Sequence, residues 1–213
     1  MDVVIAGGHG KIALRLERLL SRAGHRARAL IRNPDHAADI EAAGGEPVVC
    51  DLEATDDLAG VVKGADAVVF AAGAGPGSGA ARKRTVDYGG AVKLIDACRA
   101  AGVDRYVMVS SVGADRPDLG RGPMGPYLQA KADADTALQG SGLAFTIVRP
   151  GSLTDDPGTG RVNLTADLGN RGSVPRDDVA AVLAAVLTDR LLVGRTVELF
   201  AGDTPIESAL AAL

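Results

Sequence analysis

The sequence is poor in aromatic residues, cysteine and histidine. Its 213 residues include no tryptophan, three tyrosines, three phenylalanines, two cysteines and three histidines. Cys50 and Cys98 lack the spacing of metal ligands, so we interpret them as small buried hydrophobic residues. The histidines are scattered along the chain, and no metal site is expected.

Long apolar runs and a strong net charge are also absent. No apolar stretch approaches the length that crosses a membrane. The net charge is −4, so neither nucleic acid nor a membrane is expected as a partner. The basic run 82–84 is interpreted as a solvated face, with anion contacts as the alternative. The first predicted strand begins near residue 2 and leaves no room for a signal peptide, so we expect a cytoplasmic protein.

Strand-like and helix-like segments alternate along the chain. Apolar, β-branched runs predict strands at 3–6, 27–31, 47–50, 67–70, 106–109, 145–148 and 196–200. Patterns between them predict helices at about 11–23, 34–43, 58–63, 85–101, 125–140 and 176–188, with a last short helix near residue 205. The runs are continuously apolar, as is typical of strands covered on both faces. We therefore predict an α/β fold, a doubly wound, mainly parallel Rossmann-type sheet with helices on both faces, in a single domain over 1–213.

Three stretches interrupt this alternation. Residues 74–81 and 113–125 follow the carboxyl ends of the fourth and fifth predicted strands, where ligands of doubly wound sheets bind. Both loops are expected to border a binding site, the alternative being that they are plain surface connections. Residues 151–175 have no regular pattern and are expected to form a small cover on the substrate side.

The first predicted strand leads into a glycine-rich turn and then a helix. Glycine adopts positive φ and lets backbone amides approach phosphate oxygens, while the positive end of the helix faces the same point. This strand–turn–helix context is the one that a dinucleotide motif requires. The residues expected to contact a pyrophosphate are Gly7, Gly8, His9, Gly10, Lys11 and Ile12.

The end of the second predicted strand distinguishes the two pyridine dinucleotides. An acidic residue there binds a free ribose 2′-hydroxyl, whereas an arginine accommodates a 2′-phosphate. The chain has Arg32 at this point and no carboxylate before Asp35. This favours NADP (as NADPH) over NAD as the cofactor. The alternative is that Arg32 is an ordinary surface arginine.

Small and acidic residues follow the next two strands. Asp51 and Leu52 stand where an adenine ring is usually held, so Asp51 can accept from its amino group while Leu52 packs on the ring. Asp51 can equally cap the following short helix. Ala71, Ala72 and Gly73 are small enough to let the backbone lie beside a ribose.

A tyrosine and a lysine occur four residues apart on the predicted helix 125–140. Tyr127 and Lys131 therefore lie on one face, and a nearby ammonium favours the phenolate form of tyrosine. Such a tyrosine transfers a proton to or from a carbonyl or hydroxyl during hydride transfer. Ser111, or alternatively Ser110, can hydrogen-bond the same oxygen.

Together these motifs resemble the short-chain dehydrogenase/reductase superfamily, and are most similar to its atypical, NAD(P)H-binding branch of epimerase-like and NmrA-like proteins. The resemblance covers essentially the whole chain. It implies that the glycine turn, Arg32, Asp51 and Leu52 bind the cofactor and that Tyr127 and Lys131 form the active-site pair. It also implies that Lys131 binds the nicotinamide ribose and that Pro150 and Gly151 lie beside the nicotinamide.

The chain departs from the extended members of that superfamily in two ways. It has Val112 and Gly113 where they carry a serine or threonine, and its length leaves no room for their larger carboxyl-terminal substrate domain. The primary expectation is an NADPH-dependent reductase of a small carbonyl or quinone-like substrate. The alternatives are a cofactor-sensing regulator of the NmrA-like type and an isomerase of the epimerase or dehydratase kind. The apolar residues on several sides of helix 85–101 are consistent with a homodimer face or with two-sided packing.

Overall fold

A nine-stranded sheet forms the centre of the molecule in the computed structural model, which describes residues 1–75, 77–189 and 192–213. Its strand order is β11-β8-β10-β6-β5-β4-β1-β2-β3. The seven strands from β10 to β3 are mutually parallel. These strands are β1 (Asp2–Ala6), β2 (Arg26–Ile31), β3 (Glu46–Val49), β4 (Ala67–Phe70), β5 (Arg105–Val109), β6 (Ala144–Pro150) and β10 (Arg195–Ala201).

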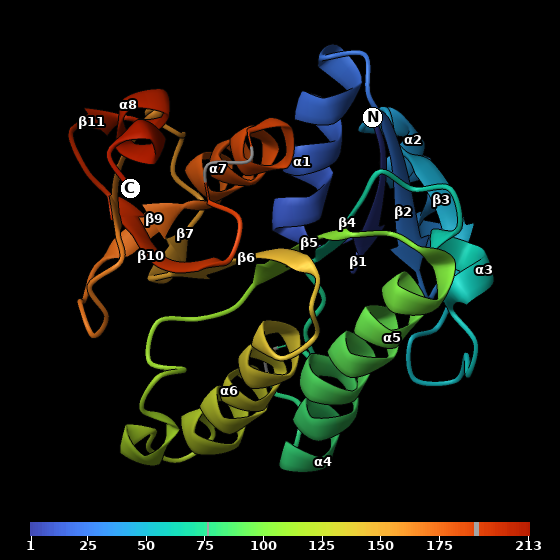
Figure 1. The fold of residues 1–213 in the computed structure, drawn as a ribbon, viewed down its shortest axis with the longest axis horizontal. Helices are drawn as coiled ribbons and strands as arrows, with labels where there is room; N and C mark the ends of the chain where they lie inside the picture. The colour runs from blue at the N-terminus through green and yellow to red at the C-terminus, as the bar shows by residue number, and fades with distance from the viewer. Residues whose placement is uncertain (76, 190–191) are drawn as a thin grey trace.

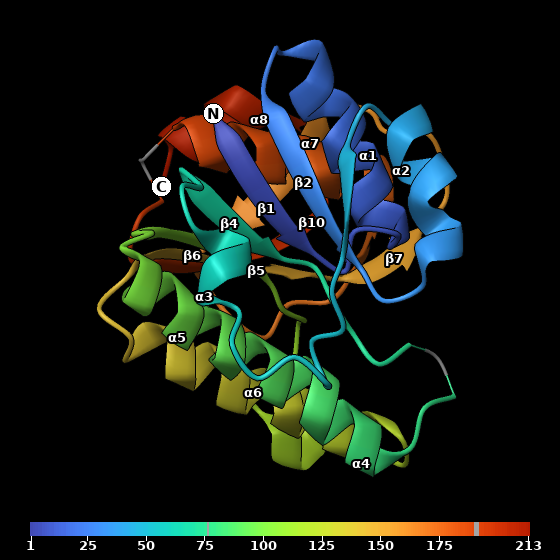
Figure 2. The ribbon, with the colours of Figure 1, turned by 90° about the vertical axis from the view of Figure 1, so that its right-hand side faces the viewer.

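Helices cover both faces of this sheet (Figures 1 and 2). One face carries α1 (Lys11–Arg22), α2 (Ala37–Ala42), α7 (Arg176–Thr188) and α8 (Ile206–Ala211). The other carries α3 (Ala59–Val62), α4 (Ala80–Arg82), the π-helical segment η2 (Lys83–Gly90), α5 (Ala91–Ala101) and α6 (Met124–Gln139). Short 3₁₀ turns, η1 (Pro34–His36) and η3 (Pro117–Leu119), precede α2 and α6.

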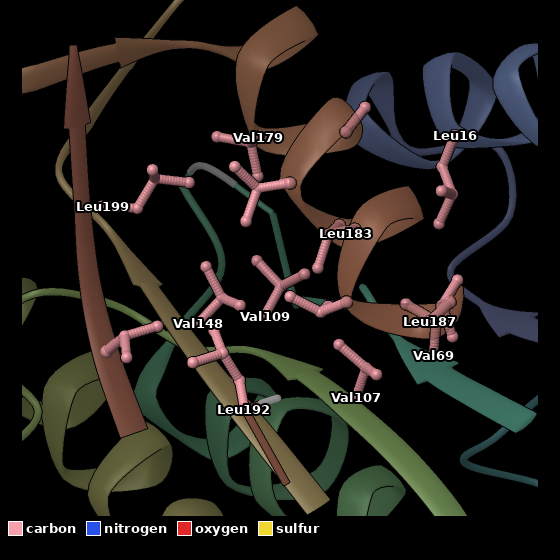
Figure 3. Close-up of a cluster of buried hydrophobic side chains, with 14 of the residues drawn as sticks. Leu16, Val69, Val107, Val109, Val148, Val179, Leu183, Leu187, Leu192 and Leu199 are labelled. Atoms are coloured by element: carbon pink, nitrogen blue, oxygen red, sulfur yellow. The ribbon is translucent and has the colours of Figure 1, made fainter. Parts of the chain in front are cut away.

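The parallel strands bury side chains on both faces. Val107, Val109 and Val148 point from neighbouring strands toward Leu183 and Leu187 of α7, as Figure 3 shows. The residues that alternate with them along β4, β5 and β6 pack on the opposite side with α5 and α6, in a cluster that includes Phe70, Met108, Ile147, Leu94 and Leu138. Burial on both faces explains why the strands are continuously apolar in the sequence.

The predicted fold class is confirmed, and the seven predicted strands correspond to the parallel strands. The two strands beyond β10 in the sheet were not predicted: β8 (Arg161–Thr165) pairs antiparallel with β10, and the edge strand β11 (Thr204–Pro205) pairs antiparallel with β8. The predicted helix 85–101 also differs, because helical structure begins at Ala80 and includes a π-helical segment before α5.

The segment 151–175 is more regular than its sequence predicts. It contains β7 (Ser152–Thr154), β8 and β9 (Ser173–Pro175), and β7 pairs with β9 in a separate two-stranded sheet. Its β7–β8 turn lies against the helices, since Asp155 accepts from Lys11 at 2.6 Å and pairs with Arg176 at 2.9 Å. The segment is therefore attached to the starts of α1 and α7 by charged contacts.

The two cysteines are buried in the apolar interior, as predicted. Burial raises the pKa of the Cys98 thiol to about 12, so this thiol stays protonated at neutral pH. No metal-binding cluster of histidine, cysteine or carboxylate side chains is found among the described residues. Nor is any helix of the described chain long and apolar enough to cross a membrane.

Helix α1 buries a carboxylate that its apolar pattern does not reveal. The buried residues of this helix are Ala13, Leu16, Glu17 and Leu20, whereas Ile12 and Leu19 are only partly buried. Neither oxygen of Glu17 has a hydrogen-bond partner among the described residues. Desolvation consequently raises the pKa of Glu17 from 4.5 to about 8.

We predict that this carboxyl group makes folding stability fall as the pH rises. Between about pH 4.5 and 8 the unfolded chain has released the Glu17 proton while the folded chain retains it, so the unfolded state binds fewer protons. The free energy of unfolding should fall by at most about 1.4 kcal/mol for each pH unit. Glu17→Gln should remove this pH dependence in urea unfolding, whereas Glu41→Gln, at an exposed position of α2, should retain it. Identical pH profiles for wild type and Glu17→Gln would contradict the prediction.

Candidate functional site

The glycine turn lies against the end of β4, the strand beside β1. Gly7 has φ +81°, and a Cβ at this position would approach the Ala72 Cα to 2.6 Å. A Cβ at Gly8 would meet the Ala29 Cβ, also at 2.6 Å. These two glycines are therefore required by close backbone approach, in addition to any role in binding.

Some of the predicted phosphate-binding amides are already engaged. Gly8 N donates to Leu30 O at 2.9 Å, and Gly10 N donates to Gly7 O at 2.8 Å. The amides of the first turn of α1 have no acceptor within the helix. Gly10 is the N-cap and brings no side chain over them. The start of α1 thus presents uncapped amides and the positive end of the helix dipole at the pocket wall.

A pocket of about 760 Å³ extends along the carboxyl ends of the parallel strands. Its volume is in the range of cofactor and small-ligand sites. The glycine turn, Arg32 and the two predicted loops contribute to its wall, as do Tyr127 and Lys131. Among the described residues of the predicted loops, those that line it are Ala74, Gly75, Gly77, Ser78, Pro123 and Met124. Pro76 of the first loop lies outside the described residues.

At the β2–β3 end of the pocket, Arg32 lies near the turn that follows β3. Asp51 Oδ1 accepts from the Glu53 amide at 2.9 Å, so Asp51 shapes its own turn. The alternative that Asp51 caps the next helix is wrong, because α3 begins at Ala59 and its amide is bonded by Asp57. Leu52 is buried and lines the pocket.

Tyr127 and Lys131 lie at the other end, on α6. Tyr127 is half-buried on the pocket wall. The Lys131 ammonium is almost completely buried and donates to Val109 O at 3.0 Å. Ser111 Oγ donates to Val112 O at 3.1 Å and also lines the pocket.

The two candidate serines differ in their surroundings. Ser110 Oγ donates to Asp135 Oδ2 at 2.9 Å inside the protein. Asp135 also accepts from Arg149 Nε at 3.0 Å, and desolvation raises the pKa of this carboxyl group against the opposing effect of Arg149. Both serines line the pocket, but Ser110 is buried and bonded to a buried side chain, whereas Ser111 is half-buried and its hydroxyl donates only to a backbone oxygen. Ser111 is therefore the more accessible of the two from the pocket.

The remaining predicted residues also lie at this edge. Ala71, Ala72 and Gly73 follow β4 and line the pocket, as do His9, Gly10, Ile12, Pro150 and Gly151. His9 stacks on His36 with ring centroids 3.7 Å apart, and its Nε2 lies 2.7 Å from Asp39. A Cβ at Gly151 would lie 2.4 Å from Gly172 O, so this glycine also permits close packing of the 151–175 segment.

Asp87 is a site residue that the sequence pattern did not indicate. It lies on the π-helical segment η2, lines the pocket, and has only 1% of its side chain exposed. Its Oδ2 accepts from Ala74 N at 3.1 Å, and its Oδ1 lies 3.7 Å from Lys131 Nζ. Oδ1 has no hydrogen-bond partner among the described residues. Asp87 therefore balances the buried charge of Lys131 and ties the β4 loop to α6.

The basic run 82–84 is only partly a solvated face. Lys83 is buried, and its ammonium donates to Ser78 O at 2.7 Å. Arg84 is exposed, pairs with Asp133 and stacks over the Tyr88 ring. Arg82 is half-buried and lines the pocket.

We predict that neutralising Asp87 destabilises the fold through Lys131. Asp87→Asn retains an oxygen for the Ala74 amide but leaves the Lys131 ammonium without its counter-charge. Removing one partner of a buried ion pair costs about 3 kcal/mol. Asp133→Asn, which disrupts the exposed pair with Arg84 between the same two segments, η2 and α6, should cost less than about 1 kcal/mol. Urea unfolding measures the free energy of unfolding of both variants. Equal losses of this free energy would show that Asp87 does not balance Lys131.

Comparisons with known proteins agree with this geometry. Residues 7–190 match the family model described as NAD(P)H-binding. The chain is 40% identical to the uncharacterised sugar epimerase YhfK of Bacillus subtilis, with all of both chains covered. A candidate NAD-dependent epimerase/dehydratase from Bacillus halodurans has a TM-score of 0.95 and 39% identity over all of both chains. The oxidoreductase ylbE from Lactococcus lactis has a TM-score of 0.87 and 25% identity, covering 100% of this chain and 96% of its own. The chain therefore belongs to the NAD(P)H-binding family, in an atypical branch of Rossmann-fold proteins with epimerase-like and reductase relatives.

Proposed function

We propose that the protein is an NADPH-dependent reductase of a small carbonyl or quinone-like substrate. The observation that carries this proposal is the shared pocket, which the glycine turn, Arg32, Tyr127 and Lys131 all line. Cofactor-binding and proton-transfer groups thus face one space at the carboxyl ends of the strands.

The residues at this edge fit an extended dinucleotide. The uncapped first turn of α1 would bind the pyrophosphate, as open helix N-termini commonly do. Asp51 and Leu52 would hold the adenine, and Ala71–Gly73 would lie beside the ribose. The unpartnered Asp87 Oδ1 and the Lys131 ammonium offer one acceptor and one donor for hydroxyl groups of the nicotinamide ribose.

Reduction of a carbonyl needs a hydride at carbon and a proton at oxygen. NADPH, held by the residues named above, would supply the hydride from its dihydronicotinamide ring. Tyr127 donates the proton to the substrate oxygen, which becomes a hydroxyl group, and Ser111 donates a hydrogen bond to that oxygen. Lys131 stabilises the remaining phenolate, which regains its proton from solvent.

The lining of the pocket is largely apolar. Met124 at the start of α6 and Leu153 on β7 are both exposed and both line it. Such walls suit an apolar substrate with one reducible group. We propose that residues 151–175 form the substrate-side cover within a single domain, since this segment supplies Leu153 and is attached to the starts of α1 and α7.

A second candidate function is a cofactor-sensing regulator. It is favoured by Lys131, which donates to Val109 O and is balanced by Asp87, so that this lysine also has a structural role.

An isomerase of the epimerase or dehydratase kind would use the cofactor without net consumption. Measuring NADPH consumption against a panel of carbonyls and quinones separates a reductase from both alternatives. Tight NADPH binding without turnover would favour the regulator.

We predict that Tyr127→Phe removes reductase activity while leaving NADPH affinity unchanged. Loss of a general acid lowers the rate by about 10²–10⁴-fold. The rate is followed by NADPH absorbance with the best substrate of the panel, and affinity by calorimetry. Tyr88→Phe, which alters a tyrosine outside the pocket lining, is the matched control and should leave the rate unaltered. Equal rates for wild type and Tyr127→Phe would remove this tyrosine from the mechanism.

We also predict that Arg32→Ala weakens NADPH more than NADH. Loss of a charge-assisted contact to the 2′-phosphate should raise the NADPH dissociation constant about tenfold. The NADH value should change little, because that cofactor carries no such phosphate. Calorimetric titration with each dinucleotide provides the comparison, and equal weakening would argue against the proposed preference.

A further inference from the structure

A carboxylate lies between two arginines at the β2–β3 end of the pocket. The Glu53 Oε2 atom is 3.8 Å from Arg32 Nη1 and 3.5 Å from Arg82 Nε. Arg32 follows β2, Glu53 follows β3, and Arg82 ends α4, so three separate elements meet there. All three side chains line the same pocket.

The position of Glu53 is fixed by several contacts. Thr85 Oγ1 donates to Glu53 Oε1 at 2.5 Å. The Lys93 ammonium donates to the carbonyl oxygens of Leu52, Glu53 and Thr55, which fixes the backbone of the turn. The Glu53 amide in turn donates to Asp51. The carboxylate is therefore held in place beside the two guanidinium groups.

We propose that Glu53 and Arg82 tune the choice between the two pyridine dinucleotides at this site. The inference rests on the proposed function, because it concerns the pocket end at which Arg32 would meet the adenosine ribose. Two guanidinium groups that converge on a carboxylate can also converge on a phosphate, since both anions accept the same fork of N–H donors. Arg82 is then the second cation for a ribose 2′-phosphate.

Glu53 acts in the opposite direction. Its carboxylate can accept from a free ribose 2′-hydroxyl, as acidic residues do in NAD-binding sites, where they usually follow the second strand. It repels a 2′-phosphate and competes with it for both arginines. The protein thus has an arginine that suits NADP after β2 and a carboxylate that suits NAD after β3. Glu53 narrows the preference for NADPH that Arg32 and Arg82 establish.

Dissociation constants for NADPH and NADH test this inference in four single variants of the full chain. Glu53→Gln keeps the hydrogen-bonding shape and removes the charge, so NADPH should bind about fivefold tighter relative to NADH. Arg82→Gln should weaken NADPH about tenfold and leave NADH nearly unchanged. Two neighbouring charges serve as controls: Asp56→Asn, at an exposed carboxylate, and Arg84→Gln, whose side chain pairs with Asp133. Neither control should alter the ratio of the NADPH and NADH dissociation constants.

The outcomes separate the two proposals. If wild-type protein binds neither dinucleotide, the proposed function fails and this inference fails with it. If both cofactors bind but the ratio stays constant in Glu53→Gln and Arg82→Gln, the inference alone is overturned. The same holds if the control variants change the ratio as much as the test variants, because a general charge effect would then explain the result. Opposite changes of the ratio in Glu53→Gln and Arg82→Gln, with unchanged controls, support it.

Discussion

The close contact between the β1–α1 turn and the end of β4 is the constraint on which the rest of the site depends. Gly7 lies so near Ala72 that a single Cβ would separate the two segments. In the sheet, β2 and β3 follow on one side of β1, whereas β5 and β6 follow on the other side of β4. The connections after β1 and β4 therefore run in opposite directions and leave a crevice beyond the carboxyl ends of these two strands. The first turn of α1 opens into that crevice, and the pocket extends from it toward Arg32 on one side and Lys131 on the other.

Charge placement gives the two ends of the pocket different characters. At the Lys131 end the charges are buried, and the contacts of Asp87, Asp135 and Arg149 fix the backbone around β4, β5 and β6. At the Arg32 end the charges are partly exposed and can exchange one anionic partner for another at little cost. Under the proposed function, the buried end would position the reacting groups and the open end would discriminate between ligands.

The structural features that could be predicted from the sequence are those that depend on residues close together in the chain. Seven strands, the glycine turn and the spacing of Tyr127 and Lys131 each follow from local periodicity. Features that depend on distant segments were missed or left open: Glu53 meets Arg82 only when the β3 turn packs beside α4. Glu17 lies on an apolar stripe where helical periodicity predicts no carboxylate. The choice between Ser110 and Ser111 also needed the fold, because consecutive residues at a strand end face different surroundings.

The π-helical segment η2 constrains the number of residues between the β4 loop and α5. A π-turn holds about one residue more than an α-helical turn, so it carries an insertion within an otherwise continuous helix. Deleting one residue there would rotate the preceding turns by about 100° relative to α5. Lys83 would leave Ser78, and Arg82 would turn away from the pocket. The helix should therefore tolerate replacement of an exposed side chain, such as that of Arg84, more readily than a change in its number of residues.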